Sequence, residues 1–353
     1  MLIKQYGWNS EWENKARVFL TDNKIVGRVI EEQKGLYRVW AEKGILSCEV
    51  SGKFRFEALA REDFPAVGDW VVLDPWKDEE KGTIHKVLER TSCFSRKVAG
   101  LKTDEQIVAT NVDSIFLVMA VNKDFNLRRL ERYLTLAWES GANPVIVLSK
   151  ADLCDEGELA ERIADVEGVA FGVPVHKVSA VLAEGMESLR SYCQEGQTVA
   201  LLGSSGVGKS TIINTLLGEE IQLVQDIRED DAKGRHTTTH RELFLLSSGG
   251  VLVDTPGMRE LQLWESEDGF KQSFEDVEKL GEQCRFRDCG HQSEPGCAVQ
   301  GAIDSGELDR GRYDSYVKLQ KEIAHLERKA NLKAQLVEKQ KMKKLSKTIK
   351  KFY

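Results

Sequence analysis

One stretch of the sequence constrains the fold more than any other, the octapeptide Gly203–Ser210, which reads Gly-Ser-Ser-Gly-Val-Gly-Lys-Ser. The apolar run Thr198–Leu202 precedes it, and a segment that favours a helix begins at Thr211. A strand, a Gly-x-x-x-x-Gly-Lys-Ser loop and a helix start in this order are typical of a P-loop, whose backbone N–H groups surround phosphate oxygens. A chance glycine-rich turn is the alternative, but it does not account for both flanking elements. The sequence therefore predicts a phosphate site here.

The polar groups of this loop and of a later strand end have complementary roles at a phosphate. Lys209 supplies a positive charge, and Ser210 is placed to hold magnesium. A second strand end delivers Asp254, whose carboxylate would join the magnesium shell, and Gly257, whose backbone N–H would meet a γ-phosphate. The predicted phosphate-binding residues are Gly203, Ser204, Ser205, Gly206, Val207, Gly208, Lys209, Ser210, Thr211, Asp254 and Gly257.

A threonine-rich segment, Arg235–His240, precedes that strand, and its Thr238 or Thr239 would complete the magnesium coordination. Met258 stands where a Ras-like enzyme carries the glutamine that orients the attacking water. Methionine cannot orient water, so we expect slow intrinsic hydrolysis unless a histidine or a macromolecular partner assists. His236 is accordingly the candidate catalytic residue, and a solvated loop histidine is the alternative.

A third motif follows the apolar run Pro144–Leu148. The tetrapeptide Ser149–Asp152 is a variant of Asn-Lys-x-Asp, in which the aspartate accepts two hydrogen bonds from the edge of guanine and so selects GTP over ATP. A helix-capping aspartate after a strand is the competing interpretation. A short loop after the run Val173–Val178 matches the segment whose backbone often touches the guanine carbonyl. The predicted guanine-contacting residues are Ser149, Lys150, Asp152, Ser179 and Ala180.

The order of these motifs is unusual, because the guanine-reading tetrapeptide precedes the P-loop instead of following it. Circular permutation is tolerated where the termini lie close together at the surface. We therefore predict a circularly permuted P-loop GTPase domain over about Leu101–Glu265, with a mostly parallel sheet and helices on both faces. The continuous apolar run Asp113–Val121 is typical of a buried parallel strand, and a helix is expected from Leu127 to the break at Gly141. We expect a loop over Arg90–Gly100.

The N-terminal part of the chain reads as five short strands separated by glycine-bearing turns. This pattern favours a small barrel, most plausibly of the OB type, a class that often binds oligonucleotides. A candidate stacking surface combines aromatic and basic residues, and the alternative is that the aromatics fill the barrel. The expected strands are Gly27–Glu31, Leu36–Ala41, Ile45–Val50, Asp69–Leu73 and Thr83–Leu88, and the candidate surface residues are Tyr37, Arg38, Trp40, Lys53, Arg55 and Phe56.

The C-terminal part combines helical composition with a compact group of metal-ligand side chains. Three thiolates and one imidazole at Cys284, Cys289, His291 and Cys297 predict one structural zinc ion in a closed tetrahedral shell. Buried cysteines without metal are the alternative. A long helix is expected over Tyr313–Lys351. The other cysteines, interpreted as inert thiols, are Cys48, Cys93, Cys154 and Cys193.

The composition places limits on the class of protein. The chain has 353 residues, a formal net charge of −7, 41% hydrophobic residues and 30% charged residues, which suits a multidomain globular protein. The apolar runs are too short for membrane spans, and the N-terminus lacks a secretory core, so we expect a cytosolic protein with no membrane partner. The segment Arg328–Lys351 contains nine lysines and one acidic residue, which favours a polyanionic partner such as RNA.

The barrel, the permuted GTPase centre and the Cys-Cys-His-Cys module together resemble the ribosome small-subunit-dependent GTPases, the RsgA or YjeQ-like family. The resemblance covers nearly the whole chain and implies domains at residues 1–100, 101–265 and 266–353. It implies a cytosolic GTPase that binds GTP, GDP and the small ribosomal subunit through ribosomal RNA, acts late in subunit maturation and is stimulated by the subunit. It also implies that His236 is catalytic, and that Ser149 departs from the common Asn or Thr. We expect a monomer.

Two other functional classes remain open from the sequence. In the first, the chain is a GTP-regulated RNA-binding module in which hydrolysis is incidental. In the second, it is an ATP-using P-loop kinase or ATPase, against which Asp152 argues.

Overall fold

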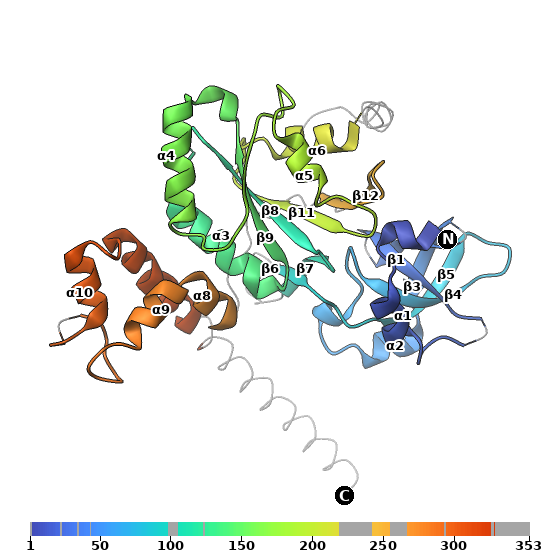
Figure 1. The fold of residues 1–353 in the computed structure, drawn as a ribbon. Helices are drawn as coiled ribbons and strands as arrows, with labels where there is room; N and C mark the ends of the chain where they lie inside the picture. The colour runs from blue at the N-terminus through green and yellow to red at the C-terminus, as the bar shows by residue number, and fades with distance from the viewer. Residues whose placement is uncertain are drawn as a thin grey trace, which may run out of the picture. The chain divides into compact units, whose positions relative to one another are not determined.

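The computed structural model describes residues 2–21, 23–33, 35–42, 44–97, 105–122, 124–218, 242–254, 267–292, 294–325 and 328. The chain divides into two compact units, Met1–Gln262 and Leu263–Tyr353 (Figure 1). The domain boundaries at residues 100 and 265 stay a prediction. Among the described helices, none is both long enough and apolar enough to cross a membrane.

Five strands close into a barrel in the N-terminal part of the first unit, as the sequence predicts. Strand β1 pairs with both β2 and β4, and β5 pairs with both β3 and β4, so the ring is complete. Alternating apolar side chains, including Val29, Val39 and Ile84, fill its interior because successive residues of a strand face opposite sides. The elements are η1 (Leu2–Tyr6), α1 (Ser10–Ala16), β1 (Ile25–Gln33), β2 (Leu36–Ala41), β3 (Gly44–Val50), α2 (Gly52–Glu57), η2 (Arg61–Asp63), β4 (Trp70–Pro75) and β5 (Lys81–Val87).

The prediction of a stacking surface on the barrel is wrong for two of its aromatic residues. Tyr37 is 3% exposed and packs in the barrel core. Trp40 lies on the outer face of β2 but is covered by the N-terminal 3-10 helix, where the Tyr6 ring stacks on it at 4.0 Å between ring centroids. Phe56 on α2 is 89% exposed. The residues that remain at the surface are Arg38, Lys53, Arg55 and Phe56.

A second sheet segment forms the centre of the first unit, with strand order β10-β9-β8-β11-β13-β12. Its neighbouring strands are parallel except β12, which pairs antiparallel with β13. The elements are β8 (Ser114–Ala120), α3 (Leu127–Ser140), β9 (Asn143–Ser149), η3 (Ala151–Leu153), α4 (Glu156–Glu167), β10 (Val175–Val178), α5 (Met186–Arg190), β11 (Thr198–Leu202), α6 (Lys209–Leu217), β12 (Glu242–Leu245) and β13 (Val251–Asp254).

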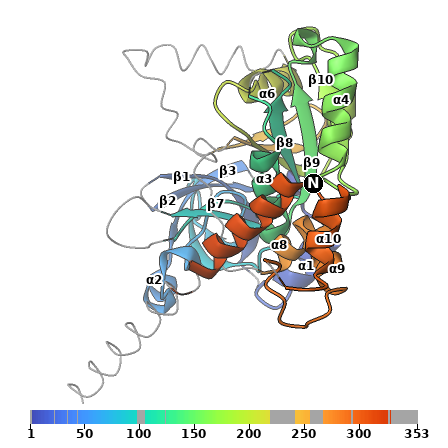
Figure 2. The ribbon, with the colours of Figure 1, turned by 90° about the vertical axis from the view of Figure 1, so that its left-hand side faces the viewer.

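Both faces of this sheet are covered by helices, as predicted (Figures 1 and 2). Phe116 and Val118 of β8 pack in one cluster with side chains of α5 and α6. Leu117 and Met119, which alternate with them, lie against Leu130 of α3 on the other face. The continuous apolar run of β8 therefore follows from burial on two sides.

The barrel and the central sheet are joined by a linker that the sequence did not predict. Part of the expected loop forms β6 (Cys93–Lys97), which pairs with β7 (Glu105–Thr110).

Arg28 of β1 is fully buried, donates to the backbone oxygens of Gly68 and Asn111 at 3.2 and 3.0 Å, and faces the Trp70 ring. Burial lowers the pKa of Arg28 to about 10, against the opposing effect of the nearby carboxylates, so it remains charged at neutral pH.

The second unit is helical. A buried guanidinium organises it, since Arg312 is 3% exposed and binds both carboxylate oxygens of Asp276 at 2.6 Å. Leu319 and Ile323, in the first part of the long helix expected over Tyr313–Lys351, are buried. Of the lysine-rich segment Arg328–Lys351, Arg328 alone is among the described residues. The elements are α8 (Glu267–Ser273), α9 (Glu275–Gly281), α10 (Ala298–Ser305) and a helix over residues 310–325.

Candidate nucleotide site and metal centre

The predicted P-loop connects the carboxyl end of β11 to the start of α6. A Cβ atom on Gly203 would lie 2.3 Å from the Val118 carbonyl oxygen, so only glycine allows this close approach to β8. Gly208 has φ +100° and is the N-cap residue of α6, where a left-handed backbone again favours glycine. The loop thus brings backbone N–H groups to a helix N-terminus, the arrangement that binds phosphate.

Lys209 lies over its own loop. Its Nζ donates to the carbonyl oxygens of Gly203 at 2.7 Å and of Ser204 at 2.6 Å. A phosphate oxygen carries a full negative charge and is a stronger acceptor than a peptide carbonyl. The ammonium group is therefore already at the mouth of the loop, next to where a phosphate would enter.

The tetrapeptide predicted to read guanine touches the P-loop directly, although more than 50 residues separate them in sequence. Ser149 Oγ donates to the Val207 carbonyl oxygen at 2.6 Å, and Lys150 Nζ donates to the Gly206 carbonyl oxygen at 2.6 Å. Lys150 adopts a left-handed backbone, with φ +58°, at the end of β9. The shorter Ser149 side chain therefore still ties the two motifs together.

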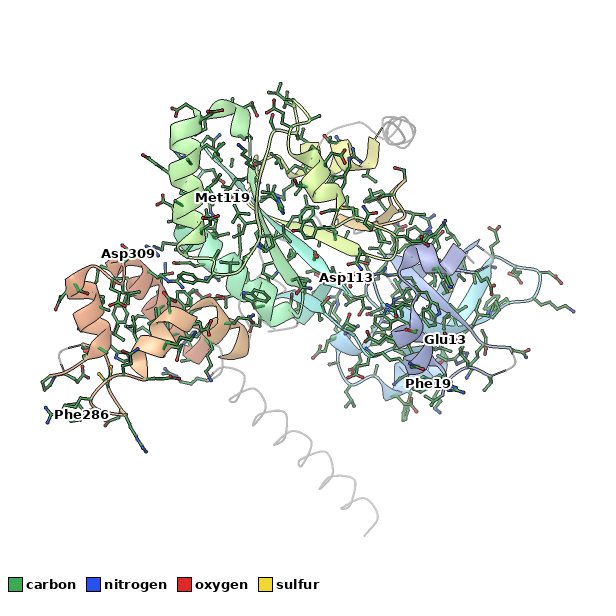
Figure 3. The ribbon with its side chains drawn as sticks, in the orientation of Figure 1. Glu13, Phe19, Asp113, Met119, Phe286 and Asp309 are labelled. Atoms are coloured by element: carbon green, nitrogen blue, oxygen red, sulfur yellow. The ribbon has the colours of Figure 1, made fainter. Side chains whose placement is uncertain are left out.

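Asp152 lies in the short 3-10 helix η3 and is exposed. The alternative interpretation, a helix cap, is wrong for this residue because Asp155 caps α4, accepting from the Glu158 N–H at 2.9 Å. Ser179 follows β10, whose Val178 pairs in register with Ser149. The carboxyl ends of β9, β10 and β11 thus bring together the predicted guanine and phosphate residues at one edge of the sheet, the usual ligand edge of such sheets. In Figure 3, Met119 marks this end of β8 and Asp113 its amino end.

The structure describes less of the predicted magnesium and catalytic set. Asp254 is the last residue of β13, which lies next to β11 with Val253 in register with Ala200. Its backbone is thus adjacent to the strand that carries the P-loop. The remaining candidates, His236, Thr238, Thr239, Gly257 and Met258, lie outside the described residues.

The four predicted metal ligands meet in the second unit, with their ligand atoms all within 4.8 Å of one another. His291 Nδ1 is 3.5 Å from both Cys284 Sγ and Cys297 Sγ, and the two sulfur atoms are 3.9 Å apart. A tetrahedral zinc ion would set two thiolate sulfurs about 3.8 Å apart and a sulfur and an imidazole nitrogen about 3.6 Å apart. The cluster, completed by Cys289, therefore has the dimensions of a metal centre.

The surroundings of the cluster hold the histidine in place. His291 has φ +55°, an unusual backbone for a residue other than glycine. Its carbonyl oxygen accepts from Gln300 Nε2 at 2.6 Å and from the Tyr313 hydroxyl at 3.0 Å. By contrast, burial raises the pKa of the Cys48 and Cys193 thiols to about 12, in agreement with their interpretation as inert.

The fold and the site together define a circularly permuted P-loop GTPase. Some of the strands that follow the P-loop in an ordinary GTPase precede it in this chain. The family model of the RsgA GTPase matches residues 87–264, and that of the RsgA N-terminal domain matches residues 26–84. A model described as an ABC transporter also matches residues 186–352, a range that includes the P-loop shared by many nucleotide-binding proteins.

Similar proteins cover nearly the whole chain. A small ribosomal subunit biogenesis GTPase RsgA 1 of Oceanobacillus iheyensis is 50% identical over 91% of this chain and 92% of its own length. An RsgA 2 protein of Vibrio parahaemolyticus is 46% identical over 91% of this chain and 86% of its own. The crystal structure of YjeQ from Thermotoga maritima has a TM-score of 0.64 at 31% identity and covers 85% of this chain and 99% of that one. The structure of YloQ, a circularly permuted GTPase, has a TM-score of 0.61 at 28% identity, covering 86% and 96%.

The chain therefore belongs to the RsgA GTPase family, and it is a GTP-hydrolysing enzyme with a permuted GTPase domain.

Proposed function

We propose that this enzyme binds GTP at the edge formed by β9, β10 and β11, and hydrolyses it on the small ribosomal subunit during late maturation, with stimulation by the subunit. The relatives named above carry small-subunit biogenesis in their names. The main support for this nucleotide site is the pair of contacts from Ser149 and Lys150 to the P-loop carbonyl oxygens. These contacts connect the residues proposed for base recognition to those proposed for phosphate binding.

The residues have separate roles in this proposal. The carboxylate of Asp152 reads the guanine edge, with Ser179 and Ala180 at the base carbonyl, and the backbone of residues 203–211 with Lys209 holds the phosphates. Ser210, Asp254 and either Thr238 or Thr239 would hold magnesium through their oxygen donors, and the ion would neutralise charge on the phosphates. Gly257 meets the γ-phosphate.

The proposed hydrolysis is slow without a partner. Met258 offers no hydrogen bond to the attacking water, so His236 is the side chain proposed to orient it. We propose that binding to the subunit orders the segment carrying His236 and so accelerates the reaction. The enzyme would then act as a timer that is read out on the ribosomal subunit.

The second unit and the barrel supply the proposed attachment to RNA. Cys284, Cys289, His291 and Cys297 would hold one structural zinc ion, because four protein ligands complete a tetrahedral shell and leave no position for a catalytic water. The exposed face of α2, with Lys53, Arg55 and Phe56, combines cations with an apolar ring as a nucleic-acid surface does. We assign three domains at residues 1–100, 101–265 and 266–353, and propose a cytoplasmic monomer.

Asp152→Asn is expected to weaken GTP binding by at least about a hundredfold, since two hydrogen bonds to a charged acceptor are lost. The asparagine amide can donate to the C2 carbonyl of xanthine, which replaces the amine of guanine, so the variant should gain affinity for xanthosine triphosphate. Titration of both nucleotides with fluorescent analogues measures the change. The matched control is Asp155→Asn, at the cap of α4. Unchanged GTP affinity in Asp152→Asn would remove Asp152 from the site.

A further inference from the structure

Arg129 places a positive charge at a position that is electrostatically unfavourable for its own helix, α3. It lies in the first turn of α3, where its backbone N–H donates to the N-cap side chain of Asn126 at 3.0 Å. The N-terminal turn of a helix carries partial positive charge and favours acidic residues, yet α3 has none in its first turn. A cation at this position therefore needs a compensating partner.

Asp124 is that partner, and it fixes the direction of the guanidinium. Arg129 Nη1 lies 2.9 Å from Asp124 Oδ1, and Nη2 donates to the Asp124 carbonyl oxygen at 2.8 Å. Asp124 is itself held by its backbone N–H, which donates to Asn122 Oδ1 at 3.1 Å. Two hydrogen bonds from a planar fork leave the guanidinium little freedom to turn.

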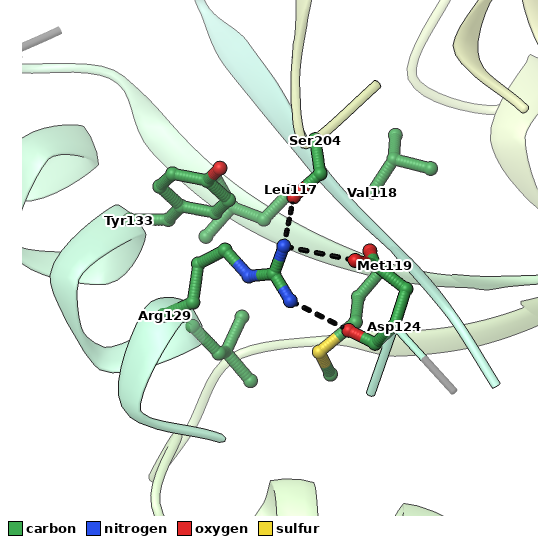
Figure 4. Close-up of a pocket in the computed structure, with 8 residues that line it drawn as sticks. Leu117, Val118, Met119, Asp124, Arg129, Tyr133 and Ser204 are labelled. Atoms are coloured by element: carbon green, nitrogen blue, oxygen red, sulfur yellow. Dashed lines mark hydrogen bonds and ion pairs between the residues drawn. The ribbon is translucent and has the colours of Figure 1, made fainter. Parts of the chain in front are cut away.

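Held in this way, the guanidinium points at the P-loop. Figure 4 shows that Arg129 Nη1 also donates to the Ser204 hydroxyl, which belongs to the second residue of the loop. The hollow beside these groups, lined in part by Leu117, Met119 and Tyr133, has a volume of about 10 Å³. That is the lower limit for one water molecule, so the hollow does not accommodate a separate ligand.

The contact matters because Lys209 holds the same residue through its backbone. In the structure the Ser204 carbonyl oxygen accepts from Lys209 Nζ at 2.6 Å. When a phosphate draws the ammonium group away, that bond is lost, and the hydroxyl contact with Arg129 still fixes this corner of the loop. The Ser204 hydroxyl therefore connects Arg129 to the P-loop.

We propose that Arg129 is a positioning residue for nucleotide binding, which holds the P-loop through the Ser204 hydroxyl with Asp124 as its anchor. The inference rests on the proposed role of the P-loop. A loop held in its binding geometry favours GTP and GDP alike, because both present phosphates to it. The contact therefore contributes to affinity and not to the chemical step.

The test is a double-mutant cycle of Arg129→Met and Ser204→Ala, measured by GTP and GDP titration and by steady-state kinetics. Arg129→Met should weaken both nucleotides about tenfold and raise KM about tenfold with kcat unchanged, the effect of one lost hydrogen bond to a charged donor. The double variant should bind no more weakly than Arg129→Met alone. Unchanged affinity in Arg129→Met, or losses that add in the double variant, would overturn the proposal.

Two controls separate positioning from stability and from the P-loop assignment. Arg128→Met removes the neighbouring arginine, whose Nη1 is 2.6 Å from Oε1 of the buried Glu131, and should leave nucleotide affinity unchanged. An equal loss in Arg128→Met would assign the effect to helix stability and refute the proposal. If Arg129→Met does not fold, Arg129→Lys replaces it in the same cycle, because lysine keeps the positive charge beside Asp124 but lacks the planar guanidinium group. Lys209→Ala in the same titration tests the role of the P-loop separately. If Lys209→Ala loses nucleotide affinity and Arg129→Met does not, the Arg129 proposal is rejected and the P-loop assignment stands.

Discussion

Replacing Lys209 by alanine is expected to lower kcat/KM for GTP hydrolysis by about a thousandfold. The ammonium group sits at the mouth of the P-loop, bonded to the carbonyl oxygens of Gly203 and Ser204, and no other described lysine contacts both. A single preorganised charge aimed at the charge that develops in a phosphoryl transfer accounts for an effect of about this size. Initial rates of phosphate release over a range of GTP concentrations, with and without small subunits, measure it.

Lys177→Ala is the matched control, because Lys177 is an exposed lysine of β10 in the same sheet. Its activity should equal that of the unmodified protein. If Lys209→Ala retained most of the activity while folded, the phosphate site would have to lie elsewhere.

Replacing Cys289 by serine is expected to release zinc and unfold the second unit. The four ligand atoms of the cluster lie within 4.8 Å of one another, and the helices α9 and α10 of this unit are short. Binding of a structural zinc ion contributes roughly 10–16 kcal/mol in small metal-dependent modules, which is as large as the whole net stability of a typical domain, about 5–15 kcal/mol. Metal analysis of the purified protein and proteolysis of the second unit measure both consequences.

The control for this change is Cys154→Ser, which alters a half-buried thiol in the first unit. It should keep one zinc ion per chain and the protease resistance of the second unit. A Cys289→Ser variant that is metal-free yet as resistant as the parent would show that the fold of this unit does not need the metal.

The meeting of the candidate guanine and phosphate residues at one edge of the sheet was largely predictable, because their motifs come at strand ends. Buried runs such as β8 and β9 are recognisable as parallel strands, and the carboxyl ends of parallel strands meet at one edge. The contact between Lys150 and Gly206 follows from this topology, although no local pattern connects the two residues. Spacing likewise predicted the cluster around His291, since its ligands are close in sequence.

The barrel surface was harder to predict, because a strand pattern does not tell what covers its outer face. Trp40 alternates out of the barrel core, as an exposed stacking residue would, yet Tyr6 from the distant N-terminal segment packs on it. Arg28 likewise has the sequence context of an ordinary strand residue, while its partners, Gly68 and Asn111, come from far along the chain. Burial by a remote segment leaves no local signal.

The contact between Arg129 and Ser204 had only a weak signal, a cation in the first turn of a predicted helix. Recognising its partner requires knowing that the loop after β8 and the P-loop are adjacent, which depends on the pairing of β8 with β11.

If this GTPase is a slow timer read on the small ribosomal subunit, as we propose, one comparison of hydrolysis rates shows it. GTP hydrolysis is measured with the protein alone, with purified small subunits and with purified large subunits, each at equal concentration and ionic strength. We expect slow turnover by the protein alone, strong acceleration by small subunits and none by large subunits. Fast hydrolysis by the isolated protein, or equal rates with both subunits, would contradict it.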